Sequence, residues 1–290
     1  MTMTKAFDRT TEDTGNVVSL DHVNVQIGDQ QQATLFYIVG LGLTRDPYMM
    51  VGLENMWLNA GRQQFHVPTR PSAPQVVRGR IGIVVPDLDE LDARLASIAP
   101  QLEGTQFSYK LHHDHYDVTC PWGNLFLCHG PMEGFNARFG IPYVEFAVPD
   151  GAASGIAGFY ENILGAVVET KTVRRNPAAV VRMGPDQTVI FREDPEETRP
   201  YDGHHIAIYI GDFSGPHKLL SERGLISEES NEHQYRFKDI IDLETGKVLY
   251  ELEHEVRSLA HPMFSRPLVN RDPVANLGNY TRGAEYLRLG

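Results

Sequence analysis

The sequence has 290 residues, of which 41% are hydrophobic and 22% charged, and its formal net charge is −12. This length suffices for one large domain or two ordinary ones, and the composition is typical of a soluble globular protein. The acidic excess argues against nucleic acid or an anionic membrane as a partner, because both favour a basic surface. No apolar run approaches the about 18 residues of a membrane-spanning helix.

The beginning of the chain is polar and lacks the apolar segment of a secretion signal, so we expect residues 1–18 to form a mobile tail. The chain contains two cysteines, Cys120 and Cys128. Two cysteines in a chain of this size do not predict a disulfide framework, and they favour a reduced, cytoplasmic setting.

Four related stretches recur along the chain. They are "LDHVNVQIGD" at 20–29, "RIGIVVPD" at 80–87, "YVEFAVPD" at 143–150 and "HHIAIYIGD" at 204–212. Each alternates in hydrophobicity, as a half-buried strand does, and each ends in Asp before a stretch with helical periodicity. The first and third of these helical stretches end alike, as F-Y-x-x-x-L-G at 36–42 and 159–165.

Short alternating segments separated by turn residues follow each predicted helix, and they indicate three further strands. The chain is therefore predicted to contain four βαβββ units of about 60 residues each. Their expected spans are 19–70, 78–133, 141–195 and 203–257. We group them as an N-terminal pair, 19–135, and a C-terminal pair, 141–257, followed by a surface tail, 258–290.

A four-stranded sheet covered on one face cannot bury its other face alone. Two units side by side form a curved eight-stranded sheet around a cavity, so four units predict an α+β fold with two such sheets and the helices outside. With its repeated strand, its F-Y-x-x-x-L-G helix ends, "PWGNLFL" and "ETGKVLYELE", the chain resembles the vicinal oxygen chelate superfamily across 19–257. That superfamily includes glyoxalase I, fosfomycin- and bleomycin-resistance proteins and extradiol dioxygenases.

The resemblance implies metal ligands at the start of the first strand and in the middle of the last strand of a unit. The first unit supplies His22 and His66 at these places, and the fourth supplies His205 and Glu251. Glu251 is one of three glutamates in the last strand, and the other two lie on the same face because strand side chains alternate.

Units 2 and 3 carry Arg80 and Tyr143 where the outer units carry histidine, so we expect them to bind no metal. This distribution favours pairing of unit 1 with unit 4, although sequential pairing is also known among four-unit relatives. Strand alternation supports the assignment, because His22 shares its face with the polar Asn24 and Gln26.

Two imidazoles and a carboxylate form the facial triad of non-haem Fe(II) enzymes, and His22, His205 and Glu251 would supply it. His66 is either a fourth ligand, as in glyoxalase-type isomerases, or an acid/base, as in extradiol dioxygenases. His233 and Tyr235 are further catalytic candidates in the sheet of unit 4.

The leading hypothesis is an Fe(II) or Mn(II) dioxygenase that cleaves a catecholic or related small molecule with O2. The alternatives are an oxygen-independent isomerase or lyase using Zn(II), Ni(II) or another divalent ion, and a metal-free binding protein. A homo-oligomer is compatible with the exposed sheet edges. The stretch "LHHDHYD" at 111–117 is similar to a metal site, but we expect a surface or substrate-contacting role because it belongs to unit 2.

Overall fold

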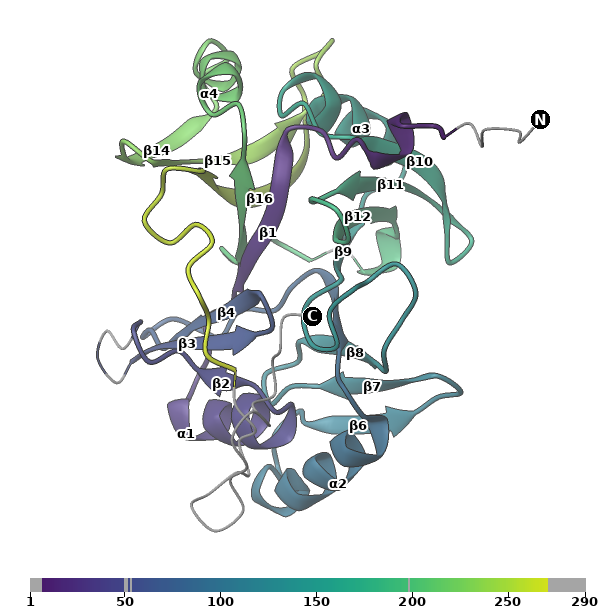
Figure 1. Ribbon diagram of the computed structural model, residues 1–290, viewed down its shortest axis with the longest axis vertical. Coiled ribbons are helices and arrows are strands. Elements are labelled where there is room, and N and C mark those ends of the chain that lie inside the picture. The colour runs from purple at the N-terminus through teal and green to yellow at the C-terminus, as the bar shows by residue number, and fades with distance from the viewer. Residues whose placement is uncertain (1–6, 50–51, 53, 198, 271–290) are drawn as a thin grey trace, which may run out of the picture.

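Two eight-stranded sheets form the framework of the protein, described here from a computed structural model that covers residues 7–49, 52, 54–197 and 199–270 (Figure 1). The first sheet has the order β14 (Ile226–Asn231), β15 (Gln234–Ile241), β16 (Val248–Ser258), β13 (His205–Ile210), β1 (Val17–Asn24), β4 (Gln63–Pro68), β3 (Asn55–Ala60) and β2 (Thr44–Arg45). The second has the order β10 (Val168–Val173), β11 (Asn176–Arg182), β12 (Thr188–Glu193), β9 (Tyr143–Val148), β5 (Gly79–Val84), β8 (Leu125–His129), β7 (His115–Thr119) and β6 (Ser108–Leu111).

Each unit has one helix between its first and second strands. These are α1 (Gln30–Ala33), which continues as a π-helical turn over Thr34–Gly40, α2 (Leu88–Ile98), α3 (Ala152–Asn162) and α4 (Ser214–Ser221). Short 3-10 turns lie at Thr10–Glu12, Ala99–Gln101 and Pro195–Glu197. The predicted α+β fold of four βαβββ units in two sheets is confirmed.

The sheets join units that are not consecutive. β1 of unit 1 pairs antiparallel with β13 of unit 4, and β5 of unit 2 pairs antiparallel with β9 of unit 3. The first and last units therefore share one sheet, as the distribution of ligand-type residues favoured. The first and last units thus meet at the centre of this sheet, where β1 lies beside β13.

The hydrophobic core instead joins consecutive units. Phe36 of unit 1 lies 5.4 Å, between ring centroids, from Phe126 of unit 2, and Phe159 of unit 3 lies 5.8 Å from Phe237 of unit 4. In Figure 1, the helices and most strands of units 1 and 2 form the lower half and those of units 3 and 4 the upper half. Each sheet spans both halves, so sheet pairing and core packing connect the four units in two different ways.

Both segments that flank the four units are bound to them. β1 begins at Val17, within the range expected to be a tail, where it pairs with Ile210 of β13. Just before it, the backbone N–H of Asn16 donates to the carbonyl of Gly165 (2.8 Å). At the other end, the segment after β16 crosses from unit 4 to unit 1. There Arg266 forms an ion pair with Asp46 (2.7 Å), and Asn59 donates to the carbonyl of Val269 (2.8 Å). Residues 1–6 and 271–290 of the two predicted tails lie outside the described residues.

The turn between β11 and β12 contacts β1, the strand that carries His22. Gly184 has φ +88°, and an added Cβ would lie 2.1 Å from the carbonyl oxygen of Val18. In the same turn, the Gln187 side chain accepts a hydrogen bond from the backbone N–H of Leu20 (3.3 Å). Glycine is therefore required here both by its conformation and by the close approach of two backbones.

We predict that Gly184→Ala lowers the free energy of unfolding by about 3 kcal/mol, of which about 1 kcal/mol reflects the left-handed backbone and the rest the displacement of β1. Gly246→Ala is the matched control, because that glycine has φ +71° but nothing within 4 Å of an added Cβ. We expect the control to lose about 1 kcal/mol. Urea denaturation measures both, and equal losses would contradict the packing argument.

Candidate metal centre

The central strand pair of the first sheet brings two predicted ligands together. In the antiparallel pairing of β1 with β13, His22 lies opposite Ala207 and Asn24 opposite His205. The two histidines are therefore diagonal neighbours on one face of the sheet. Their ring centroids are 5.8 Å apart, and both side chains are buried.

Glu255 on β16 completes a group of three. Ligand atoms of His22, His205 and Glu255 all lie within 4.8 Å of one another, and all three residues are buried. His205 Nε2 is 3.8 Å from the Glu255 carboxylate. Two imidazoles and one carboxylate in this arrangement can hold a divalent cation and leave coordination positions open.

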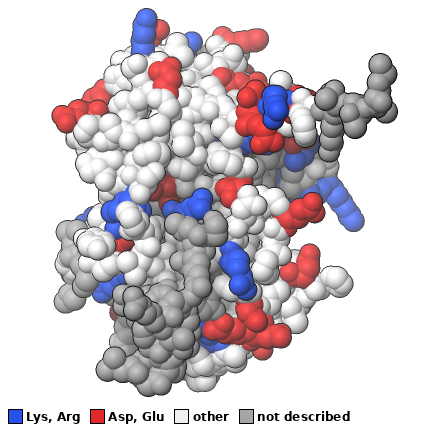
Figure 2. Space-filling view, viewed as in Figure 1, with Lys and Arg blue, Asp and Glu red and all other residues white. Residues whose placement is uncertain are grey.

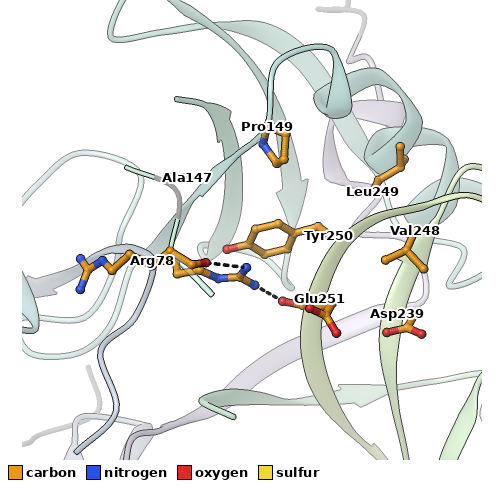
Figure 3. Close-up of a pocket in the computed structure, with 9 residues that line it drawn as sticks. Arg78, Ala147, Pro149, Asp239, Val248, Leu249, Tyr250 and Glu251 are labelled. Atoms are coloured by element: carbon orange, nitrogen blue, oxygen red, sulfur yellow. Dashed lines mark hydrogen bonds between the residues drawn. The ribbon is translucent and has the colours of Figure 1, made fainter. Parts of the chain in front are cut away.

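Glu251, the predicted carboxylate ligand, lies elsewhere. Its carboxylate contacts Lys238 (2.7 Å) on β15, and it lines a pocket with Arg78, Asp239 and Tyr250. Figure 3 shows Arg78 against the Tyr250 ring, with its guanidinium bonded to the backbone carbonyl of Glu251. The structure therefore brings Glu255, and not the predicted Glu251, together with His22 and His205.

This difference between prediction and structure arises from the register of the last strand of each unit against its first strand. In unit 1, His22 pairs with Gln64, and His66 lies two residues further along β4. In unit 4, His205 pairs with Glu253, so the equivalent of His66 is Glu255. The spacing from first-strand to last-strand position is 44 residues in unit 1 and 50 in unit 4. The longer β15 and β16 strands account for this difference, which sequence spacing alone did not reveal.

Both histidines have a carboxylate beside the ring nitrogen that points away from the group. His22 Nδ1 donates to Asp21 (2.9 Å), and His205 Nδ1 lies 3.4 Å from Glu253. A proton held on Nδ1 leaves the Nε2 lone pair free to bind a metal. Both Nε2 atoms are buried without a hydrogen-bond partner among the described residues, and a cation between them would remove this deficit.

Two guanidiniums balance the carboxylates of the group: that of Arg257 is buried and that of Arg236 is half-buried. Arg257 contacts Asp21 (2.8 Å) and Glu255, and Arg236 contacts Glu255 (2.6 Å) and Glu253. Carboxylates buried at this depth require such partners, because an unpaired buried charge is costly. Sequence analysis did not identify either arginine. Arg257 lies two residues after Glu255 on β16, and Arg236 lies opposite Glu255 on β15, so both side chains are on the same face of the sheet as Glu255.

Burial and neighbouring positive charge keep the imidazole of His205 neutral. Desolvation lowers the pKa of His205 well below its usual value, and His22 and Arg236 lower it further. The neutral form is the one that binds metal, so no proton has to be displaced from Nε2 near neutral pH.

His66 lies next to the three-residue group but outside it. Its ring stacks on Trp57 with centroids 4.1 Å apart, and its centroid is 6.2 Å from that of His22. His66 Nε2 is hydrogen bonded to the side-chain oxygen of Asn55. Burial lowers the pKa of His66 to about 2, with a smaller contribution from His22. The imidazole is therefore neutral.

The other two catalytic candidates do not lie in the group. Tyr235 is buried on the helix-facing side of β15, with ring centroids 5.0 Å from those of Phe213 and His217. His233 precedes β15 at the turn from β14 and lies 3.3 Å from Glu232. Because side chains alternate along β15, the concave face instead carries Gln234 and Arg236. The structure therefore places the predicted Tyr235 on the opposite face of β15 from the group.

The equivalent positions of the second sheet are filled by other groups. Arg80 and Arg192 both contact the buried Glu145, at 3.3 and 2.9 Å. The ring of Tyr143 packs directly on Gly82, and a Cβ added to that glycine would lie 2.5 Å from a carbon of the ring. An ion-paired cluster and a phenol ring thus occupy the place that the two histidines occupy in the first sheet.

Comparison with known proteins identifies the fold. No family model matches the sequence, and no curated protein matches it. Among solved structures, glyoxalase I from Zea mays matches with a TM-score of 0.59 and 14% identity, covering 83% of this chain and 92% of that one. A Bacillus subtilis protein provisionally named a dioxygenase matches with a TM-score of 0.57 and 15% identity, covering 87% and 91%.

The chain has the vicinal oxygen chelate fold. At these identities the likeness concerns the fold, and it agrees with the resemblance seen in the sequence. None of the helices in the described ranges is long and apolar enough to cross a membrane. On the face shown in Figure 2, acidic and basic side chains of the described residues are interspersed, without a continuous basic surface.

We predict that Glu255→Gln weakens binding of Mn(II), measured by electron paramagnetic resonance, by about 100-fold or more, because removing a ligand exceeds the effect of removing a supporting residue. Glu251→Gln is the matched control and should change the affinity less than about threefold, since its carboxylate is bonded to Lys238. Thermal unfolding shows whether each variant is folded. Weaker binding in Glu251→Gln alone would contradict the assignment.

Proposed function

We propose that the protein is a metal-dependent dioxygenase of the extradiol type, acting on a catecholic or related substrate with vicinal oxygens. The observation that supports this most directly is the arrangement of His66. It lies beside His22, His205 and Glu255 but bonds to Asn55, so the group offers three ligands and one separate imidazole. A three-ligand site leaves room for both a bidentate substrate and O2.

A bound Fe(II) or Mn(II) ion would supply a Lewis acid that holds the vicinal oxygens of the substrate and a redox centre for O2. The chain itself supplies the proton transfer. The bond to Asn55 holds a proton on His66 Nε2 and leaves the Nδ1 lone pair as a base. Stacking on Trp57 fixes the plane of the ring. The neutral imidazole can accept a hydrogen bond from a substrate hydroxyl, and the negative charge that develops on the substrate oxygen would raise the low pKa of His66 and let the ring hold the proton until it is returned.

The charges around the group favour an anionic substrate. Asp21, Glu253 and Glu255 outnumber the guanidiniums of Arg236 and Arg257 by one. A divalent cation therefore leaves the pocket with one net positive charge. A catechol that has lost one proton would balance this charge, and the base at His66 is placed to remove that proton.

A second candidate is an oxygen-independent isomerase or lyase with His66 as a fourth ligand. It is favoured by the register of the sheet, because His66 in unit 1 is the counterpart of Glu255 in unit 4. In that arrangement the metal would act only as a Lewis acid, and Zn(II) or Ni(II) would serve.

Oxygen consumption distinguishes the two functions. Protein loaded with Fe(II) under anaerobic conditions and then mixed with a panel of catechols in aerated buffer should consume O2 with at least one of them. Ring cleavage should produce a new absorbance in the visible or near-ultraviolet range. Absence of uptake with every vicinal diol, together with anaerobic activity of the Zn(II) or Ni(II) form, would favour the isomerase or lyase. A protein that binds no metal would support a metal-free binding role.

We predict that His66→Gln lowers kcat by about 10²- to 10⁴-fold, the usual contribution of a general base, while Mn(II) affinity changes less than about threefold. His233→Gln is the control, because its side chain lies near Glu232 at the β14–β15 turn, and its kcat should stay within about twofold of the parent. Loss of the metal from His66→Gln would instead identify His66 as a ligand.

A further inference from the structure

The hairpin of β6 and β7, in unit 2, carries a second group of ligand-type side chains. The backbone N–H of His112 donates to the carbonyl of His115 (2.8 Å), so these histidines face each other across a two-residue turn. Asp117 shares a face with His115 because it is two residues further along β7. The opposite face carries Tyr116 and Val118, which are buried. The three polar side chains thus project together from the same side of the hairpin.

The distances within this group match the ligand spacing of a bound metal. His112 Nε2 is hydrogen bonded to one carboxylate oxygen of Asp117 (3.0 Å), where a cation would replace the proton, and His115 Nε2 lies 3.4 Å from the other oxygen. Ligand atoms bound at about 2.0–2.1 Å to a tetrahedral or octahedral ion are about 2.9–3.4 Å apart. The two imidazole rings are stacked 4.9 Å apart, which directs both edges toward the carboxylate.

Asp114 provides an independent observation. It lies in the turn, and its carboxylate accepts a hydrogen bond from His115 Nδ1 (2.8 Å). This bond holds the proton on Nδ1 and leaves the Nε2 lone pair facing Asp117. A carboxylate behind a ligating histidine is the arrangement found around bound zinc ions, and Asp21 stands in the same relation to His22 in the first sheet.

The position of the hairpin separates this group from the first centre. It belongs to the second sheet, whose central positions are filled by Arg80 and Tyr143. His129 lies between the hairpin and that centre, 5.5 Å from His115 between ring centroids and bonded to the hydroxyl of Tyr143 (2.8 Å). The side chains of His112, His115 and Asp117 are between about a quarter and two fifths exposed, so an ion can reach them from solvent.

We propose that His112, His115 and Asp117 form a second divalent-metal site, with Asp114 as its positioning residue. Two nitrogens and one oxygen suit Zn(II), Cu(II) or Ni(II), with water in the remaining positions. The ion connects both strands of the hairpin across its turn, and its partial exposure makes it exchangeable. The site is independent of any reaction at the first centre.

Zn(II) binding to the apo protein tests the proposal. In competition with a chromophoric chelator, the parent should bind two equivalents. His115→Ala should weaken one of them at least about 10-fold and leave the other, whereas Glu255→Gln should affect only the other. Asp114→Asn should weaken the hairpin equivalent about 10-fold, as loss of a supporting carboxylate does. Anomalous X-ray scattering from a Zn(II)-soaked crystal should place one ion at the hairpin.

His113→Ala is the matched control, because this exposed histidine occupies the same turn. It should leave both equivalents unchanged. The proposal is overturned if the parent binds only one equivalent and Glu255→Gln abolishes it, or if His113→Ala weakens binding as much as His115→Ala. The last result would mean that any histidine of the turn attracts the metal. Folding of each variant is checked by thermal unfolding.

Discussion

The antiparallel contact between β1 and β13 is the interaction on which the candidate metal centre depends. It joins strands that begin at Val17 and His205, and it places His22 and His205 on one face. Closing a chain loop of this length costs on the order of 5 kcal/mol in entropy. The hydrogen bonds of an eight-stranded sheet and the apolar residues that β1 and β13 bury beneath it offset that cost. The centre therefore cannot exist in any fragment that lacks either end of the four units.

The two sheets show how one backbone scaffold can carry different chemistry. Both contain a central antiparallel pair of first strands, flanked by parallel last strands. In the first sheet the central pair presents two imidazoles with free Nε2 atoms. In the second it presents Arg80 and Tyr143, and the buried Glu145 forms ion pairs with Arg80 and Arg192. The backbone geometry is shared, so the side chains decide where a cation can be held.

A connected series of charges organises the first sheet around the centre. Arg257 links Asp21 to Glu255, and Arg236 links Glu255 to Glu253. Each carboxylate thus has a guanidinium partner, and two of them also lie beside a histidine Nδ1. Buried ion pairs of this kind contribute little net stability, because desolvation offsets their attraction. Their effect here is orientation: they hold Nε2 of both imidazoles and one oxygen of Glu255 toward the same point.

The sequence alone determined the four units, the alternating faces of their first strands and the histidines of the outer units, because these depend on periodicity and repetition along the chain. It could not determine which glutamate of β16 lies beside His205. That choice depends on the parallel register between β13 and β16, and the unequal strand lengths of units 1 and 4 conceal it. The face of β15 was likewise decided by packing, which buries Tyr235 under α4 and turns Arg236 toward Glu255. The convergence at the β6–β7 hairpin also required the tertiary structure, because only the turn geometry shows that His112, His115 and Asp117 share one side while His113 does not belong to the group.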